Sequence, residues 1–419
     1  MADLYGEIVV IGAGPAGLSA ALAAAQSGKS VLLLDDNPHP GGQIWRAGPA
    51  VELPVLARRY RQAVAAQKNI RWLHGCKVVA LCGTRRLLYE DAQHCGVIEY
   101  RRLILCCGAR ELLLPFPGWT LPGVTGAGGL QAQIKQGLDV RGQRVAIAGS
   151  GPLLLAVADT VRRSGGRVVL LAEQAPLRRT ARFVGELWRW PGKLRQSVRL
   201  VNARYRGDSR VLAAHGESRL DSIEVQEHGR VRRLACDRLA CGYGLVPNIE
   251  LALLLGCRIE QQAVAVNAQQ QSSVAHIYAA GECTGVGGSE LALAEGAIAG
   301  YAASGAPTPM RALRVREHWQ RFATAVTTTF RLDPSLKSLA TAQTVLCRCE
   351  DVMLGQVAGQ ADWRSAKLAS RCGMGACQGK VCATAARYLF DWPLPPPRAP
   401  LTPARIETLL CCMARESDV

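Results

Sequence analysis

The sequence of 419 residues is poor in aromatic side chains and contains no long uninterrupted apolar run. Phe, Trp and Tyr together make up 5% of the residues, and no stretch approaches the roughly 18 consecutive apolar residues of a transmembrane helix. The first residues lead directly into a strand-like run, without a basic segment or a cleavage site that would indicate a secretory signal. We therefore expect a cytoplasmic protein without a transmembrane segment. An electron acceptor could still bring it into peripheral association with the inner membrane.

Acidic residues are also scarce, with 33 Asp and Glu against 50 Lys and Arg and a net charge of +17. The basic residues are dispersed apart from one concentration over residues 178–199, where Phe183, Trp188 and Trp190 are interleaved. Aromatic residues among basic ones are compatible with nucleic-acid binding, but no nucleic-acid-binding fold signature accompanies them. We expect a solvated surface or a contact with an acidic protein partner, and no nucleic acid.

Disulfide-like cysteine spacing is absent from the first 300 residues, although the chain has 16 cysteines. Nine cysteines lie in that part, and several of them sit within apolar runs, where we expect them to act as small hydrophobic side chains. Seven more lie toward the C-terminus, and four of these have the spacing of metal ligands. Cys411 and Cys412, near the chain end, have no evident partner pair in the sequence.

What is present from the beginning is a glycine turn, GAGPAG, between an apolar run and a small-residue helix over residues 18–26. Gly12 permits the tight turn, Gly14 allows backbone N–H groups to approach a pyrophosphate, and Gly17 allows close packing of helix and strand. The next apolar run ends in Asp35, which is placed to accept hydrogen bonds from a ribose diol. The pattern predicts an adenine dinucleotide site, with a purely structural βαβ unit as the alternative.

Four further positions are expected to contact a flavin dinucleotide. In the loop PGGQ, Gly42 allows a close backbone approach and Gln43 offers an amide to the flavin ring, although a simple surface turn remains the alternative. The backbone of Val78 is a candidate adenine contact. Glu282 follows a strand over 276–280 and precedes a helix, so its carboxylate could take a ribityl hydroxyl or simply cap the turn.

A second copy of the nucleotide-binding unit follows, with a strand over 144–148, glycines at Gly149 and Gly151 and an acid at Glu173. Leu154 replaces the third glycine of the pattern and is expected to move the helix away from the turn. We therefore expect a vestigial site, or one that holds an adenine nucleotide such as NAD, ATP or ADP, in preference to working NAD(H) hydride transfer.

The duplication predicts an α/β protein with two Rossmann-like dinucleotide-binding domains of the flavoprotein disulfide-reductase type. The expected boundaries are a discontinuous FAD-binding domain over 1–120 and 245–305 and an inserted second domain over 121–244. A linker and a small iron–sulfur domain would occupy residues 306–419.

The metal-like pattern consists of Cys347 and Cys349, then Cys377 and Cys382. Four thiolates in two close pairs suit a [2Fe–2S] cluster, and they also suit structural zinc. The C-x-C spacing and the neighbouring flavin domain favour iron–sulfur. Cys372 is a fifth thiol that could replace a ligand, but we expect it to be a half-buried loop residue.

Taken together, the chain resembles the FAD-containing α subunits of heteromeric amino-acid dehydrogenases and oxidases. This group includes D-hydroxyproline dehydrogenase, dye-linked L-proline dehydrogenase, opine oxidase and hydrogen cyanide synthase. The resemblance covers nearly the whole chain and rests on the segments GAGPAGLSAA, PGGQIWR, GARELLLPFPGWTLPGV, GPLLLAVA, CGYGLVPN, AAGECTGVGG and CRCE with GMGACQGKVC. The last pair is similar to a bacterioferritin-associated-ferredoxin-like cluster domain.

The resemblance implies a set of FAD contacts: Gly12, Gly14, Gly17, Asp35, Gly42, Gln43 and Glu282. It implies a [2Fe–2S] cluster on Cys347, Cys349, Cys377 and Cys382. Three departures from the family pattern are Glu282 in place of an aspartate, Cys106 and Cys107 in place of an alanine–threonine pair, and the extra Cys372.

In such complexes amino-acid oxidation is assigned to a D-amino-acid-oxidase-like β subunit with its own FAD, and a small ferredoxin-like γ subunit is a further candidate partner. No catalytic residue is predicted on this chain, and no C-x-x-C pair beside the flavin loop indicates a disulfide reductase. The expected role is electron transfer for amino- or imino-acid oxidation, with D-hydroxyproline as the first substrate candidate. The alternatives are a stand-alone NAD(P)H-dependent reductase and a non-catalytic metal-bearing interaction subunit.

Overall fold

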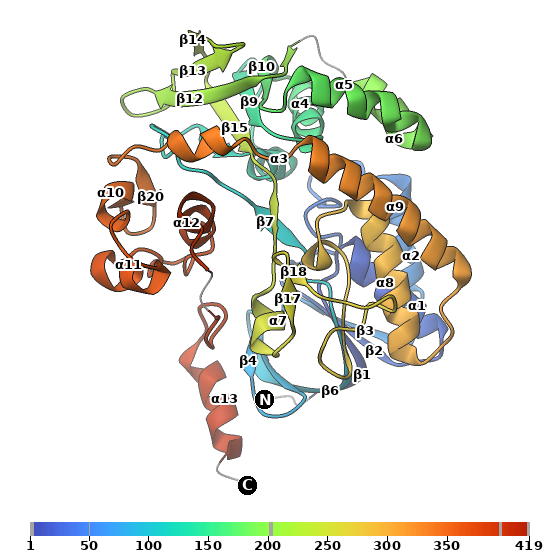
Figure 1. Ribbon diagram of the computed structural model, residues 1–419. Coiled ribbons are helices and arrows are strands. Elements are labelled where there is room, and N and C mark those ends of the chain that lie inside the picture. The colour runs from blue at the N-terminus through green and yellow to red at the C-terminus, as the bar shows by residue number, and fades with distance from the viewer. Residues whose placement is uncertain (1–3, 50, 201–203, 394–395, 417–419) are drawn as a thin grey trace. The chain divides into compact units, whose positions relative to one another are not determined.

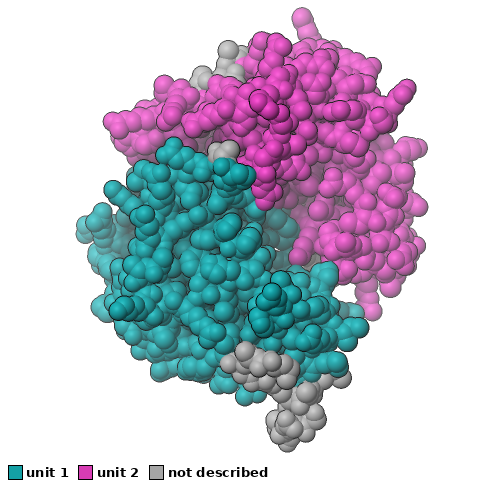
Figure 2. Space-filling model, turned by 180° about the vertical axis from the view of Figure 1, so that it is seen from behind, with its two compact units in different colours: residues 1–110, 246–323, 396–419 teal, residues 111–245, 324–395 magenta. Residues whose placement is uncertain are grey.

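The structure is a computed structural model that describes residues 4–49, 51–200, 204–393 and 396–416. Its contacts divide the chain into two compact units, coloured separately in Figure 2. Unit 1 comprises residues 1–110, 246–323 and 396–419, and unit 2 comprises residues 111–245 and 324–395. None of the described helices combines the length and the apolar character that crossing a membrane requires.

Unit 1 is built on a seven-stranded sheet in the order β3-β2-β1-β6-β5-β4, with β19 also paired to β6. Its strands are β1 Leu4–Ile11, β2 Val31–Asp35, β3 Ile70–His74, β4 Lys77–Leu81, β5 Arg86–Glu90, β6 Cys95–Leu105 and β19 Ile277–Ala279. β6 belongs to two arrangements at once, because its second half pairs in parallel with β1 and β19 while its first half pairs antiparallel with β5. A parallel nucleotide-binding sheet and an antiparallel meander of β4, β5 and β6 are thereby joined in one layer.

Two helices of unit 1 lie side by side on the parallel sheet (Figure 1). They are α1 (Pro15–Gln26) and α8 (Ser289–Ser304), and both consist mostly of small residues. A Cβ atom added at Gly296 would lie 2.1 Å from the carbonyl oxygen of Ala16, and one at Gly300 would lie 2.4 Å from that of Ala20. Small residues are therefore needed for this close helix packing. The remaining elements of unit 1 are α2 Val55–Ala65, α7 Glu250–Leu254, β17 Ile259–Glu260, β18 Ala263–Val264, the 3₁₀ turn η2 Glu282–Thr284 and α13 Ile406–Glu416.

Unit 2 repeats the parallel arrangement in a five-stranded sheet of order β11-β10-β9-β15-β8. Its strands are β8 Val124–Gly126, β9 Arg144–Gly149, β10 Arg167–Glu173, β11 Tyr205–Arg206 and β15 Arg238–Gly242. A second sheet is antiparallel and contains β12 Ser209–His215, β13 Ser222–Glu227 and β14 Arg230–Ala235. The helices of this part are α3 Ala127–Lys135, α4 Leu153–Arg163, α5 Leu177–Glu186, η1 Leu187–Arg189 and α6 Pro191–Leu200. The expected α/β class with two Rossmann-like sheets is confirmed.

Three elements include the residues at which the chain passes from one unit to the other: β7 Ala109–Glu111, β16 Leu245–Pro247 and α9 Met310–Thr329. After α9, a cysteine-bearing segment joins unit 2. It contains η3 Pro334–Ser338, β20 Val345–Cys347, β21 Val352–Met353, α10 Leu354–Val357, α11 Trp363–Ser370 and α12 Cys382–Phe390. Within unit 2 the indole N–H of Trp119 donates to the carbonyl oxygen of Val345 at 2.6 Å, and Leu336 is buried in the sheet core.

The stretch predicted as a third domain, residues 306–419, is thus shared between the units: 306–323 and 396–419 group with unit 1, and 324–395 with unit 2. The C-terminal part joins unit 1 because α13 packs on the meander and buries Glu90 between them. The Oγ1 hydroxyl of Thr408 donates to Glu90 at 2.6 Å, and Lys77 forms an ion pair with the same carboxylate at 2.9 Å.

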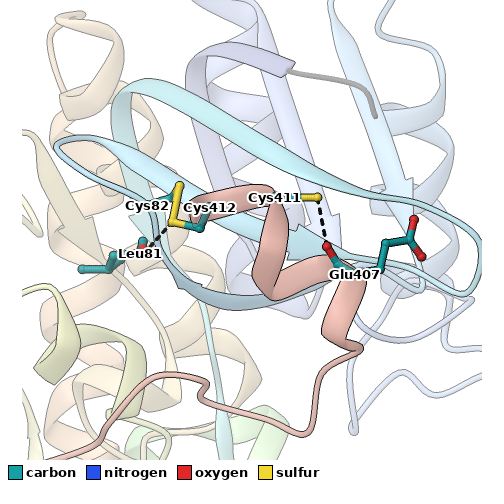
Figure 3. The surroundings of a disulfide bond; sticks show 5 residues. All are labelled: Leu81, Cys82, Glu407, Cys411 and Cys412. Carbon is teal, nitrogen blue, oxygen red and sulfur yellow. Dashed lines mark hydrogen bonds between the residues drawn. A yellow bond between two sulfur atoms is a disulfide. The ribbon is translucent and has the colours of Figure 1, made fainter. Parts of the chain in front are cut away.

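The expectation that the last two cysteines lack partners is wrong. Cys412 forms a disulfide with Cys82 (Figure 3), and the sulfur of Cys411 lies 3.3 Å from that of Cys95. Strand–helix packing brings these residues together across more than 300 positions of sequence.

Candidate cofactor and metal sites

The glycine turn of unit 1 has the geometry of a dinucleotide site. Gly12 has a φ of 101°, and a Cβ atom there would lie 2.3 Å from the carbonyl oxygen of Cys106. A Cβ atom at Gly17 would lie 1.7 Å from the carbonyl oxygen of Gly12, so neither position accepts a side chain. The added Cβ at Gly14, in contrast, meets no atom within 4 Å. Gly14, which is expected to lie against a pyrophosphate, therefore faces open space.

Asp35 lies at the end of β2 against this turn, and 6% of its surface is exposed. One carboxylate oxygen accepts a hydrogen bond from the backbone N–H of Ala13. The other accepts from the backbone N–H of Asn37 at 2.8 Å. These bonds fix the carboxylate beside the turn, where an acid reaches a ribose diol.

The loop PGGQ packs on the same turn. The N–H of Gly41 donates to the carbonyl oxygen of Ala13 at 2.8 Å, and a Cβ atom at Gly42 would lie 3.1 Å from the Cα of Gly14. Gln43 is exposed, and its amide oxygen accepts from Arg46 at 2.7 Å. Gly42 thus lies against the turn, where its backbone could approach a bound dinucleotide, as an FAD contact at Gly42 would require.

Val78 lies in β4, opposite Tyr89. Two residues earlier, the N–H of Cys76 donates to the carbonyl oxygen of Asp35 at 2.8 Å. The start of β4 is thus held next to the acid end of β2, as an adenine contact through the Val78 backbone would require.

Glu282 lies in the turn between β19 and α8. Its Oε1 accepts from the N–H of Gly288, directly before α8, at 2.8 Å. Its Oε2 is buried and has no hydrogen-bond partner in the described structure. Burial raises the pKa of Glu282, and the backbone hydrogen bonds from Gly288 and Gly287 oppose that effect. A buried carboxylate oxygen without a partner is costly, so a donor such as a ribityl hydroxyl fits this position.

Glu295, in the middle of α8, is a second buried carboxylate that the sequence interpretation missed. Its Oε2 accepts from the N–H of Gly281 at 2.9 Å and from the hydroxyl of Thr284 at 3.1 Å. Burial raises its pKa to about 7. The sequence does place this acid in the middle of a helix of small apolar residues. A charged group at such a position needs hydrogen-bond partners, which could have indicated a buried carboxylate.

Three thiols lie near this region without forming a reactive pair. Burial raises the pKa of Cys106 and Cys107 well above the usual thiol value, and it raises the pKa of Cys283 to about 12. Buried, protonated thiols are poor nucleophiles. Unit 1 therefore offers a dinucleotide cradle and a buried acid for FAD, and these three cysteines do not provide disulfide-reductase chemistry.

The second glycine turn, in unit 2, uses its acid internally. Glu173 is 1% exposed, and its Oε2 accepts from the N–H of Gly151 at 2.7 Å. Its Oε1 accepts from the N–H of Ala175 at 2.9 Å and lies 3.1 Å from the hydroxyl of Ser150. Burial raises the pKa of Glu173 to about 7 despite these bonds. Both carboxylate oxygens of Glu173, which were expected to accept hydrogen bonds from a ribose, instead accept them from the turn itself.

Residues 330–333 cover the same turn from outside. The carbonyl oxygen of Phe330 lies 2.9 Å from the Ser150 hydroxyl, and its side chain lies 3.9 Å from the position of a Cβ added at Gly151. Gln174 donates to the carbonyl oxygen of Arg331 at 3.2 Å and accepts from the N–H of Asp333 at 2.9 Å. We call these four residues the strap. Gly149 and Gly151 keep the positive φ angles of a nucleotide turn, but in this structure the turn holds a segment of the chain.

The cysteine-bearing segment brings the predicted ligands together in two groups. The sulfur atoms of Cys347, Cys372 and Cys382 all lie within 4.8 Å of one another and are buried. Cys349 is exposed, Cys377 is half-buried, and their thiols are hydrogen-bonded to each other. The expectation of a half-buried Cys372 is wrong, because this residue is fully buried beside two predicted ligands.

Glycines allow the two cysteine loops to approach. A Cβ atom at Gly375 would lie 2.2 Å from the Cβ of Cys349, and one at Gly373 would lie 2.5 Å from the Trp363 ring. Burial raises the pKa of Cys377, but backbone N–H groups of Val381, Gly379 and Lys380 and the thiol of Cys349 outweigh burial and lower that pKa. A set of thiols alone, with one stabilised as thiolate, fits an iron–sulfur cluster or zinc.

The profile of the family described as "Pyridine nucleotide-disulphide oxidoreductase" matches residues 6–300. The chain is 32% identical to hydrogen cyanide synthase subunit HcnB of Pseudomonas aeruginosa, over 89% of this chain and 90% of the relative. It is also 32% identical to one of the subunits of an opine oxidase of Rhizobium meliloti, over 90% of each protein.

Solved structures with a similar fold include L-proline dehydrogenase from P. horikoshii. The TM-score is 0.67 at 18% identity, over 97% of this chain and 80% of that chain. Thioredoxin reductase from T. acidophilum gives a TM-score of 0.56 at 19% identity, over 72% of this chain and 98% of that one. At these identities the likeness concerns the fold.

Proposed function

The chain belongs to the pyridine nucleotide-disulphide oxidoreductase family, and from this we propose that it is the electron-transfer subunit of a heteromeric amino- or imino-acid dehydrogenase or oxidase. FAD would bind in unit 1 and a [2Fe–2S] cluster in unit 2. A bound flavin accepts two electrons at once and a cluster carries one, so the pair suits transfer from an organic substrate to a single-electron acceptor.

The observation that carries this proposal is the occupied second glycine turn. Glu173 bonds its own turn, and the strap residue Phe330 lies over Gly151, at the place where a pyridine nucleotide would be held. This arrangement favours electrons that arrive from a partner protein. It disfavours a stand-alone NAD(P)H reductase, which the positive φ angles of Gly149 and Gly151 would otherwise support.

The unit 1 residues have the roles that FAD binding requires. Gly12, Gly14 and Gly17 would hold the pyrophosphate, Asp35 would accept from the adenosine ribose, and the free Oε2 of Glu282 would accept from the ribityl chain. Cys347, Cys349, Cys377 and Cys382 would hold the cluster, with zinc as the alternative metal.

The proposed partner is a D-amino-acid-oxidase-like subunit that oxidises the substrate, and a small ferredoxin-like subunit is a further candidate. The relatives are named as subunits of hydrogen cyanide synthase and opine oxidase, and the structural neighbour is an L-proline dehydrogenase. These names agree with an amino- or imino-acid substrate, for which D-hydroxyproline is our candidate.

An exposed apolar stripe on α5 and the adjoining turn η1 supports a protein partner. Leu177 and Val184 of α5 and Trp188 of η1 have 49%, 49% and 68% of their surface exposed, and Leu177 and Val184, two helical turns apart, share one face of α5. Arg178 and Arg182 lie beside this stripe and are also exposed. The chemistry fits an apolar groove rimmed by carboxylates on the partner. Val184→Glu should weaken co-elution with a co-expressed partner, whereas Val231→Glu, at an exposed position on β14, should not.

The deciding experiment is an anaerobic titration of the purified, flavin- and iron-containing chain with NADH and then NADPH. We expect no bleaching of flavin or cluster absorbance, and bleaching by an imino acid such as D-hydroxyproline once the partner is added. Rapid bleaching by either nicotinamide nucleotide would overturn the proposal in favour of a stand-alone reductase. Zinc in place of iron would favour a non-catalytic interaction subunit.

A further inference from the structure

Helix α13 places two adjacent cysteines against two strands of the unit 1 meander. Cys412 is bonded to Cys82, which directly follows β4, and the Cα atoms of that pair are 5.5 Å apart (Figure 3). Cys411 lies next to Cys95, the first residue of β6, with the two sulfur atoms 3.3 Å apart. One pair is therefore a disulfide and the other is a pair of touching thiols.

The second contact follows from the register of strands and helix. Glu90 and Cys95 are direct cross-strand neighbours of β5 and β6. On α13, Thr408 and Cys411 are three positions apart and share a helix face. Thr408 donates to Glu90 and Cys411 contacts Cys95, so two neighbours on the helix meet two neighbours on the sheet.

The surroundings hold this register firmly. Cys95 and Cys411 are 3% and 4% exposed and are buried in one apolar cluster with Val79, Leu88 and Val97. The N–H of Leu401 donates to the carbonyl oxygen of Val79 at 2.8 Å, which fixes the segment that leads into the helix. The two thiols are thus kept in contact by the packing around them.

We propose that Cys95 and Cys411 are an oxidative modification site that forms a second disulfide beside Cys82–Cys412. When α13 opens locally from the meander, one of the two thiols becomes accessible, and its thiolate attacks a small-molecule disulfide and releases one thiol, leaving a mixed disulfide. The other cysteine then attacks that mixed disulfide, and the second thiol leaves. In total Cys95 and Cys411 lose two electrons and two protons, and the small disulfide is reduced to two thiols.

The consequence of the second bond is local. Cys82–Cys412 already closes a loop of 330 residues, and the additional bond closes a shorter ring over residues 82–95, through β5 and the turns on either side of it. It therefore restricts the unfolded chain less than the existing disulfide does. It ties α13 to the first residue of β6, in addition to the existing tie to the residue that follows β4.

Tryptic peptide mapping tests the proposal directly. The chain is incubated with oxidised glutathione, its remaining thiols are alkylated, and it is digested without reduction. Cys82 lies in peptide 78–85, Cys95 in peptide 87–101, and both Cys411 and Cys412 in peptide 406–415. We expect a species in which all three peptides are linked, and its loss on reduction.

Variants separate this site from incidental oxidation. Cys95→Ser should leave only peptides 78–85 and 406–415 linked, and Cys411→Ser should give the same result if Cys95→Ser does not fold. Cys76→Ser, a buried position on the same meander, should retain the three-peptide species. The proposal is wrong if oxidised wild-type protein contains only the two-peptide species or no linked species.

Discussion

The carboxylate of Glu173 accepts a hydrogen bond from the backbone N–H of Gly151 at 2.7 Å, so the second nucleotide turn is closed by its own acid. In a working dinucleotide site an acid at this position serves a ribose. Here the carboxylate organises the turn, and the strap is hydrogen-bonded on the outer side through Ser150 and Gln174. The acid therefore serves as an internal contact within unit 2.

The burial of Glu173 makes the free energy of unfolding depend on pH. The pKa of Glu173 is raised from 4.5 to about 7 in the fold, so the folded chain binds more protons than the unfolded chain between these values. The contribution of Glu173 to stability is therefore complete below about pH 4.5 and is lost as the pH rises to about 7, by about 3 kcal/mol for this shift. We expect Glu173→Gln to flatten the decline of the unfolding free energy between pH 5 and about 7.5, as measured by urea denaturation.

The matched control is Glu186→Gln, at a less buried acid on α5 that pairs with Arg182 near the protein surface. It should reproduce the wild-type pH profile. An unchanged slope in Glu173→Gln would mean that Glu173 is not a protonated internal group.

A pair of glycine substitutions separates cofactor binding from folding in unit 1. Gly17→Ala places a methyl group 1.7 Å from the carbonyl oxygen of Gly12, which we expect to destabilise the fold by more than about 3 kcal/mol. Gly14→Ala meets no atom of the chain within 4 Å, and its φ of −71° is allowed for alanine. The Gly14 variant should fold normally but lose at least about tenfold in FAD affinity, because the methyl group occupies the pyrophosphate position.

The measurements are flavin absorbance per chain and thermal unfolding of the flavin-free protein. Similar losses of stability in the two variants would contradict the assignment of the open side of Gly14 to the cofactor.

What the sequence could predict about the sites depended on the distance along the chain between the groups involved. Asp35 and the turn of Gly12 were predictable because strand, turn, helix and strand follow one another, and the acid bonds Ala13 only 22 positions away. The link between Ser150 and Phe330 spans 180 positions, and no local pattern indicates it. The pairing of Cys82 with Cys412 required knowledge of which strand face α13 covers, and that packing is decided only in the folded chain.

The thiol set of unit 2 predicts unequal roles for its five cysteines. Cys377→Ser should remove most of the bound iron, because this sulfur is held by three backbone N–H groups and belongs to the predicted ligand set. Cys372→Ser should retain close to two irons per chain, because four other thiols are sufficient for a [2Fe–2S] cluster. Iron content and visible absorbance check both variants. Loss of iron in Cys372→Ser with retention in Cys349→Ser would assign Cys372 as a ligand.

Glu90 is expected to hold the C-terminal segment on unit 1 when the Cys82–Cys412 disulfide is reduced. It is 4% exposed and accepts from Thr408 at 2.6 Å and from the backbone N–H of Arg405 at 3.2 Å. Burial acts against its charge, but the hydrogen bonds and Lys77 outweigh burial and lower the pKa of Glu90. The stabilisation is therefore present above the ordinary glutamate pKa and is lost as the pH falls through the lowered value.

Glu90→Ala should leave the Lys77 ammonium and the Thr408 hydroxyl without this acceptor, at a cost of about 2–3 kcal/mol. Under reducing conditions we expect amide hydrogen exchange over residues 400–412 to accelerate at least tenfold, while exchange in β1 and β2 changes little. Glu99→Ala, at an exposed acid of β6, provides the control. If α13 remains as protected in Glu90→Ala as in that control, apolar packing around Val79 and Leu88, and not the buried carboxylate, holds the helix on the sheet.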